Sequence, residues 1–440
     1  MLRYEPEIKV ALLQNYKEAR LDLRGRFLLA DEKPISGNII VSGRQGEVAL
    51  CDPSGVEIAS GKAIILAAQN NATFTVSNVK IGINFHWQRS QEQSFSGNMF
   101  LSVATDSSFN LINEIALEDY LLSVISSEMS AAAPLEFLKA QAVVARSWLV
   151  AMLEKKKTAR SNTSSKNENE IIVWQDVNDH QGFDVCADDH CQRYQGITRI
   201  ISDNVRAAIE ATRGLFLISG GDICDARYYK ACGGQTEIFS TAWEDKSPDY
   251  LKSVTDNIQQ HSPIASEADA EDWLSGRPQA YCDTTDKELL GKILPAFDQE
   301  TLAFYRWQVT YSRQELEEII RKKSGIDFGE LQNIVAVGRG PSGRIYKLRI
   351  EGSKRTVIVG KELESRRWLS ESHLLSSAFL VSKTNAADGS VESFTLTGGG
   401  WGHGVGMCQI GAAVMAEKGF KAEQILAHYF QGANLQKLYG

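Results

Sequence analysis

Short apolar segments alternate with turn residues from residue 8 to about residue 105. Segments of this kind, rich in Ile, Val and Phe and separated by Gly and Asn, are typical of β-strands. They lie at residues 8–13, 39–41, 47–50 and 74–76. The pattern therefore predicts a β-rich N-terminal unit over residues 1–105.

A helical region follows from Ala116, and its strongest segment begins at Pro134. Proline suits the first turn of a helix, because the N–H that it lacks would have no partner there. Apolar residues then recur at steps of three and four, which places them on one face of a helix. These residues are Leu135, Leu138, Ala142, Ala145, Leu149 and Met152. An amphipathic helix with one buried face is expected.

The rest of the chain mixes helical and strand patterns. Residues 155–170 are polar and predict a solvated loop, while residues 260–330 are acidic and mostly helical. Strands are expected at 171–174, 215–218, 334–337, 344–350 and 355–359, and a final helix at 421–428. The fold class predicted is therefore α+β: a mixed core with a strong amphipathic helix, preceded by the β-rich unit.

Composition narrows the possible classes of protein. The chain has 440 residues, 43% of them hydrophobic and 23% charged, which is an ordinary globular balance for two or three domains. A net charge of -8 is not the basic field that duplex binding needs, so nucleic acid is not an expected partner. No run of about 18 apolar residues predicts a membrane span. The charged first residues, with Arg3 and Glu5, show no signal peptide, so an export signal is expected to be absent or already removed.

Residues 338–343 match G-x-G-x-x-G after a predicted strand. A dinucleotide site would need a helix next, so that its N-terminus could hold the pyrophosphate. The alternating segment 344–350 follows instead. A hairpin turn is therefore predicted, and the nucleotide reading is rejected.

Two histidines and two cysteines lie close together in the chain: His180, Cys186, His190 and Cys191. Thiolates and imidazoles are ligands that Zn²⁺ prefers, and four of them close a tetrahedral shell. Such a zinc would be structural, because no position remains for water. The alternatives are a surface loop or a Cys186–Cys191 disulfide. Since side chains of neighbouring residues point to opposite faces of a strand, His190 and Cys191 can both ligate only from a turn.

The segment 398–407 places six glycines around Trp401 and His403. Glycine allows close backbone approach and positive φ, so a binding or catalytic loop is favoured over a linker. Other candidates have ordinary explanations when taken alone. Glu128 near a helix start is usually a dipole-favoured charge, and the strip formed by Lys139 and Arg146 is usually a solvated face.

Three separated segments together resemble one family. They are residues 120–146, residues 211–214 with 228–237, and residues 400–412, which contain SSEM, ATRG and GWGHGVGMCQIGA. The chain resembles the bacterial stage II sporulation protein D family, whose relatives include the amidase enhancers of cell-wall lysis. The likeness covers about residues 110–245 and 390–438. One departure is Lys230-Ala-Cys232 before Gly-Gly, where small hydroxyl residues are usual.

The resemblance implies a lytic transglycosylase that cuts peptidoglycan glycan strands, most readily strands without stem peptides. The family's acid/base glutamate falls on Glu128. Substrate-binding residues implied by the motifs are Lys139, Arg146, Tyr228, His403 and Gln409. Some sporulation members carry a structural zinc, whose ligands would be His180, Cys186, His190 and Cys191.

The implied chemistry needs one carboxyl group. Glu128 would protonate the oxygen between N-acetylmuramic acid and N-acetylglucosamine, then deprotonate the muramyl 6-hydroxyl as it closes on C1. A hydrolase would need a second carboxylate. Two alternatives remain: a non-catalytic glycan-binding enhancer of a cell-wall amidase, and a zinc hydrolase, which four protein ligands would leave without an open position.

The expected partners are glycan strands and a cell-wall amidase or another sporulation or lysis protein. The substrate implies a location in the cell envelope or outside the cytoplasm. Four parts are predicted: a β-rich accessory unit over 1–105, a sporulation protein D-like core over 106–250, an acidic insertion or second subdomain over 251–390, and a C-terminal part over 391–440 that completes the core.

Overall fold

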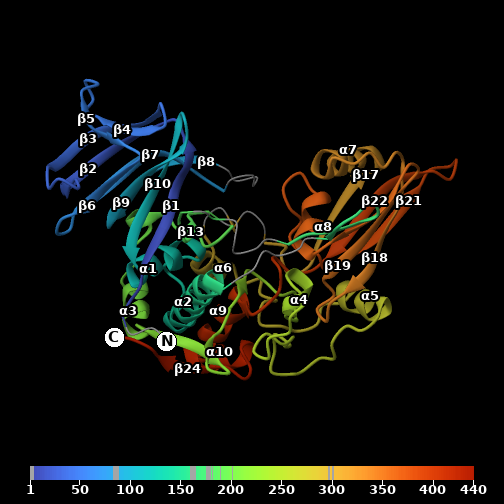
Figure 1. Cartoon of the computed structure of the whole chain (residues 1–440). Coiled ribbons are helices and arrows are strands. Elements are labelled where there is room, and N and C mark those ends of the chain that lie inside the picture. Colours follow the sequence, from blue (N-terminus) through green and yellow to red (C-terminus); the bar gives the residue numbers. More distant parts are fainter. Residues whose placement is uncertain are drawn as a thin grey trace. The chain divides into compact units, whose positions relative to one another are not determined.

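The computed structural model describes residues 4–82, 89–158, 165–174, 180, 182–188, 190–200, 202–295, 298–299 and 302–440. The chain forms two compact units (Figure 1). Unit 1 comprises Met1–Ala133, His180–Leu215 and Lys437–Gly440, and unit 2 comprises Pro134–Asp179 and Phe216–Gln436. Both contain helices and strands, so the α+β class is confirmed.

Unit 1 is built on a large sheet. Its strands before the first helix are β1 (Glu7–Tyr16), β2 (Glu18–Leu28), β3 (Pro34–Arg44), β4 (Glu47–Cys51), β5 (Glu57–Gly61), β6 (Ala63–Ala68), β7 (Thr73–Ile81), β8 (Arg89–Ser96), β9 (Asn98–Thr105) and β10 (Ser108–Ala116). With β13 (Val185–Cys186) they form one 11-stranded sheet in the order β13-β1-β10-β9-β6-β2-β3-β4-β5, with β7 paired to β2 and β8. The β-rich N-terminal pattern is therefore confirmed.

Helices close unit 1 at the end of β10. That strand runs directly into α1 (Leu117–Glu128), and the turn η2 (Gly196–Arg199) and α3 (Asp203–Ala211) follow later in the chain. Both η2 and α3 pack on α1. The return segment also adds β13 to the sheet edge, parallel to β1, with Cys186 opposite Ala11.

Unit 2 begins with α2 (Leu135–Thr158), which lies where an amphipathic helix is predicted and packs on α9 (Gln409–Glu417) and α10 (Ala422–Tyr429). The final helix is thus confirmed at α10. The expectation of a single buried face is wrong, because every residue from 140 to 150 is buried. Short pairings lie nearby: β14 (Leu215–Ser219) with β15 (Asp222–Ile223) and β24 (Asn434–Lys437), and β16 (Tyr228–Tyr229) with β23 (Met407–Cys408).

Two further sheets and their helices make up the middle of unit 2. One has the order β11 (Ser165–Lys166), β12 (Glu170–Ile172), β20 (Thr356–Gly360), β19 (Ile345–Gly352) and β18 (Leu331–Arg339). The other has β17 (Trp307–Ser312), β22 (Val391–Gly398) and β21 (Phe379–Asn385). The helices are α4 (Phe239–Ala242), α5 (Glu267–Ser275), α6 (Lys287–Ile293), α7 (Arg313–Ser324) and α8 (Glu362–Trp368). One hydrophobic core, which includes Trp368, Ile350 and Leu396, joins the two sheets.

Two expectations about loops have different outcomes. Residues 338–343 connect β18 to β19 in an antiparallel hairpin, as predicted. The prediction that residues 155–170 form a loop is wrong at both ends: α2 continues to Thr158, and β11 and β12 occupy 165–166 and 170. Lysine is a good helix former, and β12 is fixed by pairing with the distant β20, which local composition cannot reveal. Residues 159–164 lie outside the described residues.

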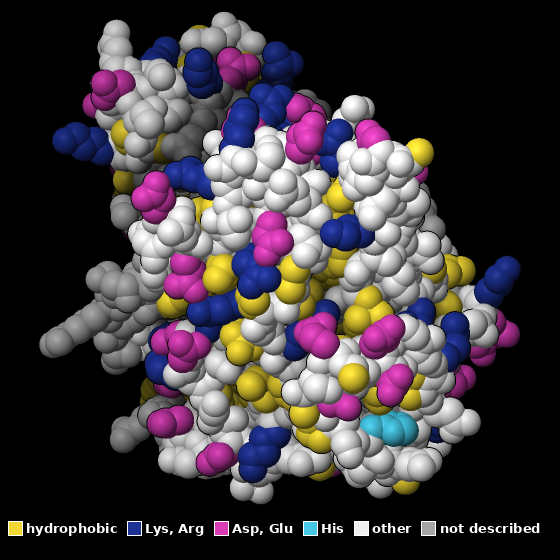
Figure 2. Space-filling view, turned by 90° about the vertical axis from the view of Figure 1, so that its right-hand side faces the viewer, with side chains coloured by type: hydrophobic (Ala, Val, Ile, Leu, Met, Phe, Trp, Pro, Cys, Tyr) yellow, Lys and Arg dark blue, Asp and Glu magenta, His cyan; other side chains and the backbone are white. Residues whose placement is uncertain are grey.

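The surface carries both signs of charge. On the face seen in Figure 2, Lys and Arg side chains are interspersed with Asp and Glu side chains. Among the described residues, no helix combines the length and the apolar character that crossing a membrane requires.

The buried guanidinium of Arg344 joins two loops of unit 2, one at residues 231–232 and one at Gly402. Its side chain is fully buried. Nε donates to the carbonyl of Gly402 at 3.0 Å, Nη1 to that of Cys232 at 3.2 Å, and Nη2 to that of Ala231 at 3.4 Å. A buried charge is tolerated only with such partners, so these loops depend on Arg344 and Arg344 on them.

A carboxylate completes this network. Nη1 of Arg344 also donates to Ser342 Oγ at 2.9 Å, and Ser342 Oγ donates to Glu237 Oε2 at 2.6 Å. The backbone N–H of Glu237 donates to the carbonyl of Gly404 at 2.7 Å. Burial raises the pKa of Glu237, although Ser342 and Arg344 oppose that shift.

The glycines of the 398–406 segment are required by this packing. Gly404 has φ +86, and a Cβ there would lie 2.5 Å from Arg344 Cζ. Gly400, Gly402 and Gly406 also have positive φ. At Gly404, the group that approaches the backbone closely is therefore a side chain of the protein itself.

Gly404→Ala is expected to destabilise unit 2 more than Gly419→Ala. Gly419 has nearly the same φ, +91, but nothing lies within 4 Å of its added Cβ. The left-handed backbone should cost each variant about 1–2 kcal/mol, and overpacking against Arg344 should cost Gly404→Ala about 1–3 kcal/mol more. Urea unfolding measures both losses. Equal losses would show that Arg344 can move aside.

Candidate functional site

Glu128 is the last residue of α1 and is half-buried. Its Oε1 accepts a hydrogen bond from the backbone N–H of Arg193 at 2.9 Å. The interpretation of Glu128 as a charge near a helix start is wrong, because it lies at the C-terminal, negative end of the helix dipole. The last turn of α1 contains no basic residue. The carboxyl group is thus held by a backbone donor of another segment.

The segment that holds Glu128 is itself fixed along α1. Tyr120 donates its hydroxyl hydrogen to Gln192 Oε1 at 3.1 Å, and the Gln195 N–H donates to Ser123 Oγ at 3.1 Å. The ring of Tyr194 stacks on that of Tyr120, with centroids 5.1 Å apart. Residues 192–195 therefore run against α1 as a bonded strap.

The candidate metal centre directly precedes this strap. His180 Nε2 lies 3.0 Å from Cys191 Sγ. His190 Nδ1 lies 3.4 Å from Cys191 Sγ and 4.0 Å from Cys186 Sγ. All four ligand atoms lie within 4.8 Å of one another. Ligands about 2.0–2.3 Å from one zinc ion are about 3.3–3.8 Å apart in a tetrahedron, so the set fits the ion.

The chemistry and backbone of this cluster also fit a metal. Hydrogen bonding, foremost from Cys191, lowers the pKa of Cys186 to about 2, which favours the thiolate that binds metal. His190 and Cys191 lie in a turn, as predicted, while Cys186 is anchored in β13. Both cysteines are free thiols, so the disulfide alternative does not apply here. The converging side chains also distinguish the cluster from an ordinary surface loop.

The basic residues predicted on α2 differ from each other. Lys139 Nζ forms an ion pair with Glu136 Oε1 at 2.8 Å and is partly exposed. Arg146 is fully buried, so the interpretation of a solvated face is wrong for this residue. Gln409, at the start of α9, is also buried, and its Nε2 lies 3.4 Å from Gln141 Oε1 on α2. Only Lys139 of these three presents its polar group near the surface.

Tyr228 and the glycine-rich segment lie together. β16 pairs in parallel with β23, with Tyr228 opposite Met407. The next residue, Tyr229, packs edge-on to His403 with ring centroids 5.3 Å apart, and Trp243 does so at 4.9 Å. The topology thus brings two segments about 175 residues apart in sequence into one part of unit 2.

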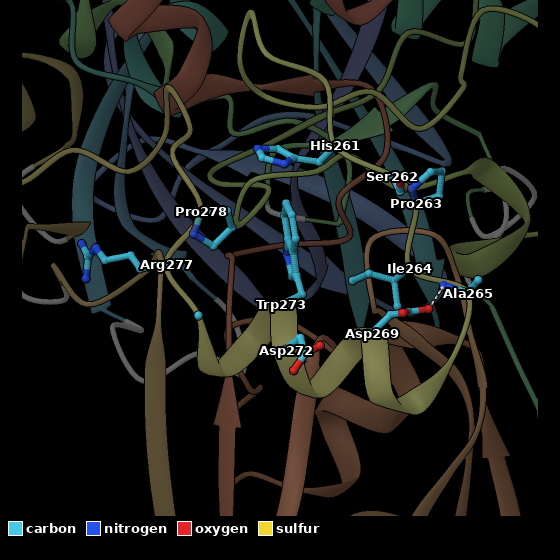
Figure 3. A pocket seen from close by; sticks show the side chains of 11 residues that line it. His261, Ser262, Pro263, Ile264, Ala265, Asp269, Asp272, Trp273, Arg277 and Pro278 are labelled. Atoms are coloured by element: carbon cyan, nitrogen blue, oxygen red, sulfur yellow. Dashed lines mark hydrogen bonds between the residues drawn. The ribbon is translucent and has the colours of Figure 1, made fainter.

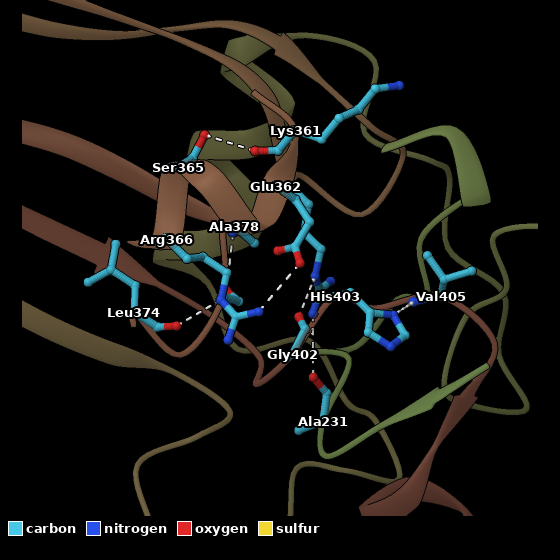
Figure 4. A network of polar contacts seen from close by, with 12 residues as sticks. Ala231, Lys361, Glu362, Ser365, Arg366, Leu374, Ala378, Gly402, His403 and Val405 are labelled. Carbon is cyan, nitrogen blue, oxygen red and sulfur yellow. Dashed lines mark hydrogen bonds and ion pairs between the residues drawn. The ribbon is translucent and has the colours of Figure 1, made fainter. Parts of the chain in front are cut away.

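His403 is held in its neutral form. Its Nδ1 accepts the N–H of Val405 at 3.1 Å, a bond that Figure 4 draws together with the separate Glu362–Arg366 ion pair. Burial lowers the pKa of His403 well below its usual value, and the charges of Arg227, Arg344 and Arg366 lower it further. The ring can therefore accept or donate a hydrogen bond but carries no charge at neutral pH.

The two units divide the predicted residues. Unit 1 contains Glu128 and the four candidate metal ligands, and unit 2 contains Lys139, Arg146, Tyr228, His403 and Gln409. Within unit 2, Tyr228 and His403 belong to paired segments.

A cavity of about 700 Å³ lies beside α5 in unit 2. Trp273 points into it toward His261, with ring centroids 5.4 Å apart (Figure 3). The carboxylate of Asp269, also in its lining, accepts the Ser266 N–H and caps α5. None of the residues that the motifs single out lines this cavity.

Sequence reasoning missed several residues of unit 2. Arg344 lies in a hairpin strand pattern, where nothing marks it as buried. A second cluster, Cys232, Asp256, Cys282 and Cys408, gathers from segments far apart in the chain, so no spacing motif could show it.

Comparison with known proteins supports the resemblance found in the sequence. The model described as Stage II sporulation protein matches residues 105–218, and one described as Domain of unknown function (DUF8618) matches residues 237–406. Stage II sporulation protein D of Bacillus subtilis (strain 168) is 26% identical over 328 residues, 74% of this chain and 76% of that protein. The Bacillus amyloliquefaciens protein of the same name is 25% identical over 327 residues, 74% of this chain and 76% of that protein.

A third relative carries a different name. The amidase enhancer of Bacillus subtilis (strain 168) is 25% identical over 327 residues, which is 72% of this chain and 40% of that protein. Residues 105–218, which match the sporulation protein model, include Glu128 and all four candidate ligands of the first cluster. The chain is a mixed α+β protein that is similar to the stage II sporulation protein D and amidase enhancer family.

The neutral His403 predicts a stability that falls in acid. Below pH about 6.5, the imidazole of His403 binds a proton in the unfolded chain but not in the folded chain. The free energy of unfolding therefore falls by up to about 1.4 kcal/mol per pH unit, until the pH reaches the pKa of His403 in the folded chain. His373, with a pKa lowered to about 4, and His428 act in the same direction. Urea unfolding at about pH 7 and about pH 5 should show a smaller drop for His403→Gln than for the unaltered chain. The same drop in both would mean that His403 ionises freely.

Proposed function

We propose that the protein is a peptidoglycan lytic transglycosylase that acts on glycan strands, in sporulation or cell-wall remodelling. The observation that carries the proposal is Glu128, a half-buried carboxyl group that the Arg193 N–H fixes at the end of α1. This glutamate stands where the family motif has its acid. A lone positioned carboxyl group is what this reaction requires.

Glu128 would serve first as acid and then as base. In the first step it gives its proton to the oxygen between N-acetylmuramic acid and N-acetylglucosamine, and the bond from C1 to that oxygen breaks. In the second, its carboxylate takes the proton of the muramyl 6-hydroxyl, whose oxygen bonds to C1. The products are a free N-acetylglucosamine end and a 1,6-anhydro-N-acetylmuramic acid end. Water takes no part, so no second carboxylate is needed.

The substrate-binding residues divide by exposure. Tyr228, His403 and Lys139 are only partly buried, so they are proposed to contact the glycan. Arg146 and Gln409 are buried and would act by positioning α2 and the start of α9. This refines the role of Gln409 from contact to support.

Zinc is proposed as a structural ion held by His180, Cys186, His190 and Cys191. Four protein ligands leave no open position, so the ion would not activate water, which argues against a zinc hydrolase. When bound, it would fix the turn that precedes the strap at residues 192–195. The acid at Glu128 would then be held by a segment anchored at one end by metal.

A second candidate function is a non-catalytic enhancer that binds glycan and activates a cell-wall amidase. It is favoured by the relative named amidase enhancer, whose match covers 72% of this chain. Both functions take glycan strands as the ligand and place the protein at the cell envelope. They differ in whether Glu128 turns over substrate.

Glu128→Gln should keep glycan binding and lose anhydromuramyl product. The amide has the same shape but cannot give up and recover the proton, and general acid catalysis usually accounts for about 10²–10⁴-fold in rate. Mass spectrometry of products from denuded glycan strands measures the loss.

Glu210→Gln is the matched control, because Glu210 is an exposed glutamate on α3 in the same unit. It should leave the product yield unchanged. If Glu128→Gln forms as much product as the control, the transglycosylase proposal fails. If no variant forms product while all bind glycan, the enhancer function takes its place.

Cys191→Ser should abolish the stabilisation that zinc gives to unit 1. Metal at about 100 times its Kd adds about 2.7 kcal/mol to a folded state that alone binds it. Added zinc should therefore raise the thermal midpoint of the metal-stripped chain more than that of the variant, which lacks a ligand of the unit 1 cluster. Cys51→Ser, on β4 of the same unit and outside both clusters, is the control and should respond like the unaltered chain. A response by Cys191→Ser equal to that of the control would exclude Cys191 as a ligand.

A further inference from the structure

A second group of side chains that could bind a metal lies in unit 2 and includes none of the residues proposed for catalysis or substrate binding. It consists of Cys232, Asp256, Cys282 and Cys408, all fully or almost fully buried. Their three sulfur atoms and one carboxylate oxygen lie within 4.8 Å of one another. The sulfur atoms of Cys232 and Cys282 are 3.4 Å apart. Tetrahedral zinc holds such ligands about 3.8 Å apart, so the group needs only a small adjustment.

Backbone N–H groups point at the sulfur atoms. The N–H groups of Cys232 and Gly411 donate to Cys408 Sγ at 3.3 and 3.4 Å, and the Gly234 N–H donates to Cys232 Sγ at 3.3 Å. Sulfur is a weak acceptor as a thiol and a far better one as a thiolate, so this arrangement suits the charged form. Hydrogen bonds of this kind are the outer-shell contacts that orient metal ligands.

The carboxylate is the feature that ordinary packing does not explain. Buried thiols can simply fill space as small apolar groups. Asp256, however, is 0% exposed and accepts hydrogen bonds from the Cys282 N–H at 2.8 Å and from the Tyr429 hydroxyl at 2.5 Å. Both donors are neutral, and no ion pair of Asp256 occurs in the described part of the chain. Burial raises the pKa of Asp256 well above its usual value, so the carboxyl group alone would stay protonated, whereas a cation bound at the three sulfur atoms would stabilise its ionised, ligating form.

The cations nearest in sequence are already engaged. Lys230, two residues before Cys232, pairs with Asp298 at 2.9 Å. Arg344 donates to the carbonyl of Cys232 rather than to its sulfur.

We propose that Cys232, Cys282, Cys408 and Asp256 bind a second structural Zn²⁺ ion. Three thiolates and one carboxylate oxygen form a closed four-coordinate shell, and thiolates select zinc over the harder magnesium and calcium ions. The ion joins the end of β16, the start of α9 and the segment between α4 and α6. It therefore holds the pairing of β16 with β23, and with it Tyr228 and the 398–407 segment.

Metal content of the full-length protein tests this proposal independently of catalysis. Elemental analysis of the folded chain, purified under reducing conditions, is compared among single and double variants. Cys282→Ser should lose one zinc equivalent relative to the unaltered chain. Cys224→Ser is the matched control, because Cys224 is a buried free thiol of unit 2 outside both clusters, and it should lose none. Equal zinc in Cys282→Ser and Cys224→Ser would overturn the proposal.

The two clusters are separated by a double variant. Cys191→Ser removes a ligand of the first cluster only, so Cys191→Ser with Cys282→Ser should contain one equivalent less than Cys191→Ser alone. This difference is expected whether or not the first cluster holds zinc, so the outcome is distinct from that of the first metal proposal. A Cys232–Cys282 disulfide found by mass spectrometry in the native, metal-free chain would also overturn the proposal.

A spectroscopic measurement covers the case in which Cys282→Ser does not fold. Cobalt loaded into the Cys191→Ser chain should give intense near-ultraviolet thiolate-to-metal charge transfer together with the visible bands of tetrahedral Co²⁺. Asp256→Asn should shift the visible bands and keep the charge transfer, since it changes the oxygen ligand and none of the sulfurs. Absence of charge transfer in the folded Cys191→Ser chain would refute a thiolate site here.

Discussion

Unit 2 depends on one buried charge. Arg344 reaches the carbonyls of Ala231, Cys232 and Gly402 and shares Ser342 with Glu237. Truncating a buried, hydrogen-bonded charge typically costs 3–5 kcal/mol, because its partners are left unpaired. The Gly-rich segment and the β16 loop, which carry His403 and Tyr228, are therefore held in place by a residue that contacts neither side chain by hydrogen bond. Two glycines of that segment, Gly400 and Gly404, pass so close to Arg344 that a Cβ there would lie within 3 Å of its guanidinium group.

In unit 1, a backbone N–H group holds the important side chain in place. The Arg193 N–H holds Glu128, and Arg193 lies two residues after Cys191. The stacked rings of Tyr120 and Tyr194 keep this segment against α1. A metal in the adjoining turn would thus affect the position of the Glu128 carboxyl group through the segment from Cys191 to Arg193, without contacting the substrate. A structural ion at this turn would therefore affect the proposed reaction only through the position of Glu128.

The elements that follow local pattern were predictable, and those that depend on distant contacts were not. Short apolar segments separated by turn residues predict the β-rich unit, apolar residues at steps of three and four predict α2, and the alternating segment after Gly343 predicts the hairpin. Each of these patterns lies within a few neighbouring residues. The burial of Arg146 was not visible, since a strip beside an apolar face reads as solvated until the packing of α9 and α10 on α2 is known. The first cluster was found because its ligands lie within twelve residues. The second was missed because its ligands span residues 232–408.

The sequence separation between ligands also means that the two clusters assemble at different stages of folding. Closing a loop costs about (3/2)RT ln n, so joining Cys232 to Cys408 costs about 2.5 kcal/mol more than joining His180 to Cys191. The first cluster can form from its own loop and the edge of β1, whereas the second exists only after β16 has paired with β23 and Arg344 has gathered the neighbouring carbonyls. Its ligands are almost completely buried once that has happened, so an ion must enter before the loops close. Metal bound there would then exchange only when this part of unit 2 opens. The fraction of sites that hold metal would therefore depend on the metal present while the chain folds, and little on metal added to the folded protein.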